Sequence, residues 1–386
     1  MIPYGRQNIT QADVDAVVEV LKSDFLTQGS KVPEFEQKIA KHVGASHALA
    51  VNSATSALHI ACLALGLSEG DILWTTPVTF VASANCGIYC GAQVSFVDID
   101  PRTYNLCPSA LENKLKQAQV DGCLPKIVVV VHLCGQPCKM EKIKELSIEY
   151  GFSVVEDASH AIGGKYKNEF IGNCRYSDIT VFSFHPVKII TTAEGGMTLT
   201  NDQKLAEKMA LLRSHGVTRD PKLMTHQSDG AWYYQQVDLG FNYRMTELQA
   251  ALGISQLTRL NEFVEKRHEL AQRYDYLLKD LPIVTPWQDP DSYSGLHLYV
   301  IRLKLEEISQ THKRVFEALR NAGIGVNLHY IPVHTQPYYK KRFGFEDEDY
   351  PESMKYYSEA ISLPMYPDLT AENQTTVALV LREICS

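Results

Sequence analysis

Short apolar runs alternate with helical patterns along the first half of the chain. The runs fall at residues 47–51, 71–75, 94–97, 126–132, 153–156 and 178–184, and helical patterns at residues 55–65 and 140–150 lie between them. Alternation of this kind predicts a mostly parallel sheet that helices cover on both faces. Ligands of such sheets gather at the carboxyl ends of the strands.

Helical patterns also flank this alternating region. Thr10 and Asp13 have the spacing of a capping box before one helix, and Pro33 opens a second. A long helical pattern over residues 245–278 would lead to a smaller C-terminal domain, where residues 296–303 and 325–329 favour strands and residues 313–322 a helix. We therefore expect a large domain over residues 1–250, followed by a linking helix and a small α+β domain over residues 251–386.

Charge and hydropathy narrow the class of protein. The chain has 37 Lys and Arg against 45 Asp and Glu, which gives a net charge of −8 and argues against general nucleic-acid binding. No apolar run approaches the roughly 18–20 residues of a membrane span. The N-terminus soon meets Asp13 and Asp15, so it does not have the pattern of a signal peptide. These features predict a cytoplasmic protein without a membrane segment.

The nine cysteines fit the same compartment. An odd number of cysteines without a secretory signal indicates reduced thiols. Cys86 and Cys90, and likewise Cys134 and Cys138, have a C-x3-C spacing that allows a metal site but lacks a completing pair of ligands. Buried thiols that pack as small apolar groups are the better interpretation, and we expect no metal.

A lysine segment follows the strand pattern at residues 178–184. Ser183 ends the apolar run, Lys188 comes shortly after it, and Gly195-Gly196 lets the chain fold back closely. A lysine just past a strand end can sit at the floor of a cleft and form a Schiff base with pyridoxal phosphate. Ser183 can donate a hydrogen bond to the phosphate of that cofactor.

A second segment suits an anion. In Asn52-Ser53-Ala54-Thr55-Ser56 a strand ends and a helix begins among small residues. Backbone N–H groups and the helix dipole favour a phosphate there. An ordinary Ser or Thr cap of the helix explains the same residues equally well.

A third segment ends the run at residues 153–156. Asp157 can reach a pyridine nitrogen and keep it protonated, which makes the ring a better electron sink. Glu156 should point to the opposite face, because side chains alternate along a strand. His160 could pack against the cofactor or orient Asp157, or it could be a core histidine.

A fourth segment precedes the long helical pattern. Asn242 and Arg244 are polar residues of a predicted turn in Gly240-Phe241-Asn242-Tyr243-Arg244-Met245. They could serve a binding site, or they could be a helix cap with a solvated arginine.

Taken together, these four segments resemble the nucleotide-sugar aminotransferases of the DegT/DnrJ group over nearly the whole chain, most of all those of the pseudaminic acid pathway. The resemblance implies a fold type I enzyme that uses pyridoxal phosphate, with a mostly parallel seven-stranded sheet and a small C-terminal domain. It also implies a homodimer with its active site shared between the subunits.

The resemblance implies residue roles as well. Lys188 would be the Schiff-base lysine and Asp157 the partner of the pyridine nitrogen. Many family members carry glutamine at the position of His160. The other cofactor-binding residues would be Ala54, Thr55 and Ser183 near the phosphate, Phe80 over the ring, His160, and Asn242 reaching the neighbouring subunit's cofactor. Residues that would touch the nucleotide sugar are Tyr4, Asp24, Phe25, Leu26, Thr27, His329, Tyr330, Ile331 and Pro332, and His329 and His334 could meet a diphosphate or be structural loop residues.

The expected reaction is transfer of an amino group, with glutamate as donor, to the C4 ketone of a UDP-linked 4-keto-6-deoxy-N-acetylhexosamine. A dTDP-linked 4-keto sugar is the alternative substrate, and dehydration of a sugar on the same fold is the alternative reaction. Some family members that dehydrate sugars carry histidine in place of the lysine, so Lys188 favours transamination. An inactive relative that serves as a binding partner is disfavoured by the intact lysine and aspartate. A Rossmann dehydrogenase is disfavoured because no G-x-G-x-x-G follows the first strand.

Overall fold

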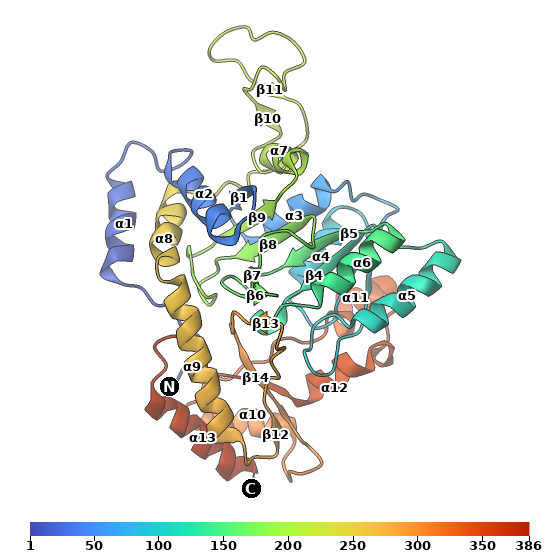
Figure 1. Ribbon diagram of the computed structural model, residues 1–386, viewed down its shortest axis with the longest axis vertical. Coiled ribbons are helices and arrows are strands. Elements are labelled where there is room, and N and C mark those ends of the chain that lie inside the picture. The colour runs from blue at the N-terminus through green and yellow to red at the C-terminus, as the bar shows by residue number, and fades with distance from the viewer. Residues whose placement is uncertain (386) are drawn as a thin grey trace.

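The computed structural model describes residues 1–385 and has a seven-stranded sheet at its centre (Figure 1). Strands β8, β5, β4, β2 and β3 are parallel, and β9 runs antiparallel to its neighbours β1 and β8. This arrangement confirms the expected α/β class. In spatial order the strands are β1 (His47–Val51), β9 (Gly196–Thr200), β8 (Ile179–Ser183), β5 (Ser153–Asp157), β4 (Ile127–Val131), β2 (Ile72–Thr75) and β3 (Gln93–Phe96).

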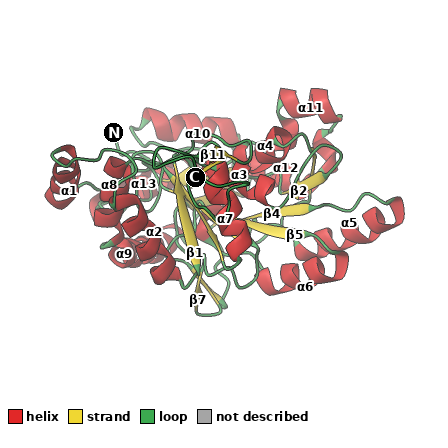
Figure 2. Ribbon diagram, turned by 90° about the horizontal axis from the view of Figure 1, so that it is seen from above, coloured by secondary structure: helices red, strands yellow, loops and turns green. Residues whose placement is uncertain are grey.

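Helices cover both faces of this sheet (Figure 2). The sequence of β4 is one isoleucine and four valines, all buried, as expected for a parallel strand that is enclosed on both sides. Two separate apolar cores result, one on each face. The covering helices are α2 (Lys31–Val43), α3 (Ala54–Ala64), α4 (Ala82–Tyr89), α5 (Pro108–Asp121), α6 (Met140–Tyr150) and α7 (Gln203–Leu212).

Two predictions about helices that flank the sheet region have different outcomes. The capping box at Thr10 and Asp13 is present at the start of α1 (Gln11–Leu21). The single long helix expected over residues 245–278 is wrong, because the structure has α8 (Glu247–Leu257) and then α9 (Leu260–Leu278). The chain leaves helical geometry at Arg259, whose φ is −108° and whose side chain binds Asp13. A contact between two residues that are distant in sequence therefore accompanies the break between α8 and α9.

Helix α9 leads to the C-terminal part of the chain (Figure 1), which has a third apolar core. A three-stranded antiparallel sheet of β12 (Ile283–Val284), β14 (Tyr299–Leu303) and β15 (Ala360–Leu363) packs there with α10 (His312–Asn321) and α13 (Ala371–Cys385). The strand predicted at residues 325–329 is wrong, because only Asn327 pairs, in an isolated bridge to Ser362. The division of the chain at residue 250 stays a prediction.

Shorter elements complete the chain. A hairpin of β10 and β11 projects at the top of Figure 1, away from the sheet. No helix within residues 1–385 combines the length and the apolar character needed to cross a membrane. The remaining elements are β6 (Lys165–Tyr166), β7 (Glu169–Phe170), β10 (Val217–Thr218), β11 (Gln235–Gln236), β13 (Ser292–Tyr293), α11 (Pro337–Phe343) and α12 (Pro351–Glu359).

Candidate active site

A cavity of about 570 Å³ lies at the carboxyl ends of the central strands. The last residues of β4, β5 and β8, which are Val131, Asp157 and Ser183, all line it. Parallel sheets bind ligands at this edge, and the volume suits a small organic molecule. Of the predicted cofactor and substrate residues, the cavity brings together Tyr4, Ala54, Thr55, Phe80, Asp157, His160, Ser183, Lys188, His329 and Tyr330.

Lys188 is half-buried and faces this cavity. It lies in the loop that links β8 to β9. Burial lowers the pKa of its amine to about 8, and the charge of Asp157 opposes that shift. A substantial share of this amine is therefore neutral near pH 8, as a nucleophile requires.

Asp157 is buried, with 6% of its surface exposed, and has two hydrogen-bond donors. The hydroxyl of Ser83, on α4, donates to Oδ2 at 2.6 Å. The backbone N–H of Ser159 donates to Oδ1 at 3.1 Å. These contacts fix the orientation of a carboxylate at the end of β5, where it faces the same cavity as Lys188.

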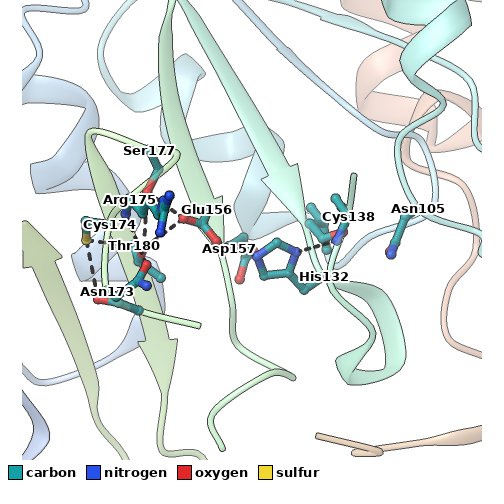
Figure 3. Close-up of polar contacts among 12 residues, drawn as sticks. Asn105, His132, Cys138, Glu156, Asp157, Asn173, Cys174, Arg175, Ser177 and Thr180 are labelled. Carbon is teal, nitrogen blue, oxygen red and sulfur yellow. Dashed lines mark hydrogen bonds and ion pairs between the residues drawn. The ribbon is translucent and has the colours of Figure 1, made fainter. Parts of the chain in front are cut away.

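Glu156 belongs to a separate polar group (Figure 3). Its carboxylate accepts hydrogen bonds from His132 Nε2 at 2.7 Å and from the Ser177 hydroxyl at 2.5 Å. Burial raises the pKa of Glu156, but these hydrogen bonds outweigh burial and hold the pKa below its ordinary value. Glu156 and Asp157 share no partner, as expected from the alternation of side chains along β5.

The first turn of α3 forms another wall of the cavity. Ser53 caps the helix by accepting the N–H of Ser56 at 3.1 Å, so the cap interpretation is correct for this residue. Ala54 and Thr55 begin the helix and line the cavity. Capping and anion binding are therefore compatible here, because free N–H groups and the helix dipole remain at this end.

Gly196 permits the close approach of β9 to this turn. A Cβ atom at Gly196 would lie 2.5 Å from the backbone carbonyl of Ser53 and 2.6 Å from the N of Ala54. Only glycine fits that space without moving the turn. Gly196, in the Gly-Gly pair of the lysine segment, thus allows β9 to pack closely against the first turn of α3.

His160 is oriented by two neighbours. Its Nδ1 accepts the N–H of Cys134 at 3.3 Å, so the proton of the neutral ring is on Nε2 and points to the Tyr330 hydroxyl at 3.1 Å. Burial first, and the nearby charge of Lys188 next, hold the pKa of His160 well below its ordinary value. The ring of Tyr330 also lies 6.1 Å from that of Phe80. A neutral histidine and two aromatic rings thus line one part of the cavity.

The two histidines considered for a diphosphate differ in position. His329 lines the cavity, where its Nδ1 shares a 2.8 Å hydrogen bond with Ser362. Burial and the charge of Lys188 lower the pKa of His329 to about 3, so the ring is neutral. His334 does not line the cavity. It is fully buried with its ring 4.7 Å from that of Tyr350, which is a core position.

Seven predicted site residues do not line this cavity. Asn242 is exposed, and its backbone carbonyl accepts a hydrogen bond from Asn52 at 3.4 Å. Phe25 and Leu26 are 61% and 48% exposed, in a segment between α1 and α2. Their predicted contacts stay predictions. The seven residues are Asp24, Phe25, Leu26, Thr27, Asn242, Ile331 and Pro332.

Sequence reasoning missed several residues of the site, among them Ser83, Glu194 and Asn327. Ser83 binds Asp157 directly, and Glu194 and Asn327 line the cavity. Thr79 and Ser83 are four residues apart at the start of a helix, and their hydroxyls lie 2.8 Å apart. That spacing, just after a strand, was the available signal for Ser83.

The chemistry of the lining fits pyridoxal phosphate. An amine of lowered pKa, an oriented carboxylate and a helix N-terminus with nearby hydroxyls face one space. These groups match the aldehyde, the pyridine nitrogen and the phosphate of this cofactor. Among residues 1–385, no group of three or more His, Cys, Asp or Glu side chains is arranged to hold a metal ion.

Comparison with known proteins gives the same family over almost the whole chain. The model of the DegT/DnrJ/EryC1/StrS aminotransferase family matches residues 7–382. The spore coat polysaccharide biosynthesis protein SpsC of Bacillus subtilis (strain 168) is 38% identical over 99% of this chain and 97% of its own. The UDP-4-amino-4,6-dideoxy-N-acetyl-beta-L-altrosamine transaminase of Campylobacter jejuni is 38% identical over 97% of this chain and 94% of its own.

Solved structures agree with these relatives. Helicobacter pylori PseC, an aminotransferase involved in the biosynthesis of pseudoaminic acid, has a TM-score of 0.91 at 32% identity, covering 100% of this chain and 99% of its own. The PLP-form of the putative sugar aminotransferase Spr1654 from Streptococcus pneumoniae has a TM-score of 0.87 at 27% identity, covering all of both chains. These findings confirm the expected enzyme class and cofactor. The chain belongs to the DegT/DnrJ/EryC1/StrS aminotransferase family.

Proposed function

We propose that this enzyme transfers an amino group from glutamate to the C4 ketone of a UDP-linked 4-keto-6-deoxy-N-acetylhexosamine, as in pseudaminic acid biosynthesis. The observation that carries the aminotransferase chemistry is the single cavity that Lys188 and Asp157 both face, with the first turn of α3 beside them. The sugar is inferred from the names of the Campylobacter jejuni and Helicobacter pylori relatives.

Bound pyridoxal phosphate supplies an aldehyde that captures amines and a ring that stabilises negative charge on the adjacent carbon. Asp157 would bind the pyridine nitrogen. Ser83 and the Ser159 N–H would hold the Asp157 carboxylate in place for this contact. Lys188 would bind the aldehyde and then move a proton between two carbons. A pKa of about 8 suits both steps, because an amine near its pKa can accept and return a proton at neutral pH.

Other lining groups would orient the ligands. Ala54, Thr55 and Ser183 would receive the cofactor phosphate. Phe80 and His160 would lie against the cofactor ring, and the Nε2–H···O contact between His160 and Tyr330 would fix both side chains. Tyr4, His329 and Tyr330 would meet the sugar, with His329 present as a neutral ring rather than as a cation.

The site also suggests a homodimer. A nucleotide diphosphate and an amino-acid carboxylate are anionic, yet Lys188 is the one lysine or arginine among the described residues that line the cavity. Phe80 is 56% exposed at the cavity, and Asn242 is exposed away from it. A second copy would cover Phe80 and bring its own Asn242 to the cofactor phosphate. The segment at residues 24–27 and Ile331-Pro332 would complete the sugar site.

A substrate panel tests this proposal. Purified enzyme with pyridoxal phosphate and glutamate is assayed on UDP- and dTDP-linked 4-keto sugars, with and without an N-acetyl group, and 2-oxoglutarate is measured with the sugar product. We expect 2-oxoglutarate and a 4-amino sugar in equal amounts, fastest with the UDP-linked N-acetyl sugar. A preference for dTDP sugars would overturn the nucleotide assignment. Sugar dehydration without 2-oxoglutarate would overturn the reaction.

A further inference from the structure

The first residues of the chain, at positions 2–8, form a strap beside the cavity. The Gly325 N–H donates to the Ile2 carbonyl at 2.6 Å, and the Met365 N–H donates to the Tyr4 carbonyl at 3.0 Å. Ile2 also packs against the third apolar core. The first half of the strap is therefore fixed to the C-terminal part of the chain.

Tyr4 is the residue through which the strap reaches the cavity. Tyr4 and His329 both line this space, and the centroids of their rings lie 5.6 Å apart. Lys188 and Glu194 line the cavity from the loop that links β8 to β9. The cavity thus has one wall formed by Tyr4 and His329, the Tyr4 wall, and another formed by the lysine loop, the Lys188 wall.

Asn8 lies at the far end of the strap and binds three other residues. Its Nδ2 lies 2.9 Å from each carboxylate oxygen of Asp368, in the segment between β15 and α13. Its side-chain oxygen accepts a hydrogen bond from the Arg259 guanidinium, and its backbone carbonyl accepts one from Nε2 of Gln256 at 2.8 Å. Asn8 therefore joins the C-terminal part of the chain to the last turn of α8 and the break that follows it.

Helix α8 is fixed in turn to the Lys188 wall. In its first turn, Nε2 of Gln249 donates to the Glu194 carbonyl at 2.7 Å. After its last turn, Arg259 pairs with the carboxylate of Asp13, which is 1% exposed and needs a partner for its charge. A chain of contacts thus runs from the Lys188 wall through α8 to Asn8, and from Asn8 to the Tyr4 wall.

We propose that Asn8 is a positioning residue, because its contacts with Asp368 and Arg259 set the spacing between the Tyr4 wall and the Lys188 wall. The inference rests on the proposed function, in which a keto sugar contacts Tyr4 while its C4 carbon reaches the cofactor. Glutamate is smaller than a nucleotide sugar, and the proposed function gives it no contact with Tyr4. A change at Asn8 should therefore weaken the sugar half of the reaction and spare the glutamate half.

Separate measurement of the two half-reactions tests this role. In Asn8→Ala, we expect glutamate to convert bound pyridoxal phosphate at a rate within about twofold of wild type, and KM for the keto sugar to rise roughly tenfold with little change in kcat. Gln11→Ala is the matched control, because it removes an exposed 2.8 Å hydrogen bond from an amide to Asp15 within α1. Equal losses in both half-reactions, or an unchanged KM for the sugar, would overturn the proposal.

A paired substitution separates positioning from a general loss of stability. Asn8→Asp removes the amide that donates to Asp368 but keeps an oxygen for Arg259. Combining it with Asp368→Asn exchanges donor and acceptor, so the hydrogen bond can form again. We expect the pair to return KM for the sugar to near the wild-type value, and Asn8→Asp alone to leave it raised. A pair as weak as the single variant would refute the role of this contact.

Hydrogen exchange tests the contacts of Asn8 without any substrate. The strap carbonyls accept hydrogen bonds from the amides of Gly325 and Met365, which should slow exchange at these amides. In the holoenzyme, we expect exchange at least about tenfold faster in Asn8→Ala than in wild type or in Gln11→Ala. Unchanged protection would overturn the inference. This result does not depend on the identity of the sugar, so it is distinct from a failure of the proposed function, which the substrate panel reveals.

Discussion

At the scale of single residues, the position of Lys188 controls its chemistry. Burial in the cavity lowers the pKa of its amine to about 8, and Asp157 limits this shift by favouring the charged form. An exposed lysine has a pKa near 10.4 and is almost fully charged at neutral pH. The fold therefore gives Lys188 a larger neutral fraction at neutral pH than an exposed lysine has.

This environment predicts how cofactor loading depends on pH. Only the neutral amine attacks an aldehyde, so the loading rate should rise with pH and level off above about 8, where Lys188 is mostly deprotonated. Stopped-flow absorbance of cofactor-free protein mixed with pyridoxal phosphate measures the rate. A rate that keeps rising through pH 10 would show an ordinary exposed lysine instead.

The Ser83 hydroxyl is predicted to strengthen cofactor binding through Asp157. Ser83→Ala removes the 2.6 Å hydrogen bond to Oδ2 and leaves the carboxylate held only by the Ser159 N–H. A lost hydrogen bond to a charged group costs about 1.5 kcal/mol, so we expect the Kd for pyridoxal phosphate to rise by roughly tenfold. Fluorescence titration measures it, with Ser358→Ala on the exposed surface as the control. An unchanged Kd would remove Ser83 from the site.

At the scale of elements, the meeting of β9 with the first turn of α3 shapes the phosphate end of the cavity. In Gly196→Ala the new methyl would lie 2.5 Å from the Ser53 backbone and would push this turn aside. We expect at least a tenfold weaker affinity for pyridoxal phosphate, from loss of one or more phosphate contacts. In the control Gly5→Ala the methyl meets only Val187, at 4.0 Å. Equal affinity in both variants would contradict the placement of the phosphate.

The strands, and the pair of site residues Lys188 and Asp157, were predictable because local sequence determines them. Short, β-branched apolar runs such as β4 are typical of enclosed strands, and alternation puts Asp157 and Glu156 on opposite faces of β5. Contacts between distant segments were not predictable. The helix break at Arg259 accompanies its contact with Asp13, Asn327 pairs only with Ser362, and Ser83 joins the site by packing of α4 on the sheet.

At the scale of the whole molecule, the proposed dimer predicts complementation between two defective variants. If Asn242 completes the partner's site, then Lys188→Ala and Asn242→Ala chains combine into mixed dimers in which one site carries both defects and the other carries none. Random exchange of equal amounts should restore about a quarter of wild-type activity. The mixture is assayed after the subunits are dissociated and reassembled, with each variant alone as the control. Activity no higher than the mean of the separate variants would exclude a shared site.

The most direct test of the central claim is covalent trapping of the cofactor. Holoenzyme is reduced with borohydride, digested and mapped by mass spectrometry, with Asp157→Asn as a parallel sample. The structure predicts one modified peptide, with the reduced cofactor on Lys188, and weaker retention of cofactor in Asp157→Asn. Modification of a different lysine, or none at all in protein that contains bound cofactor, would contradict the account.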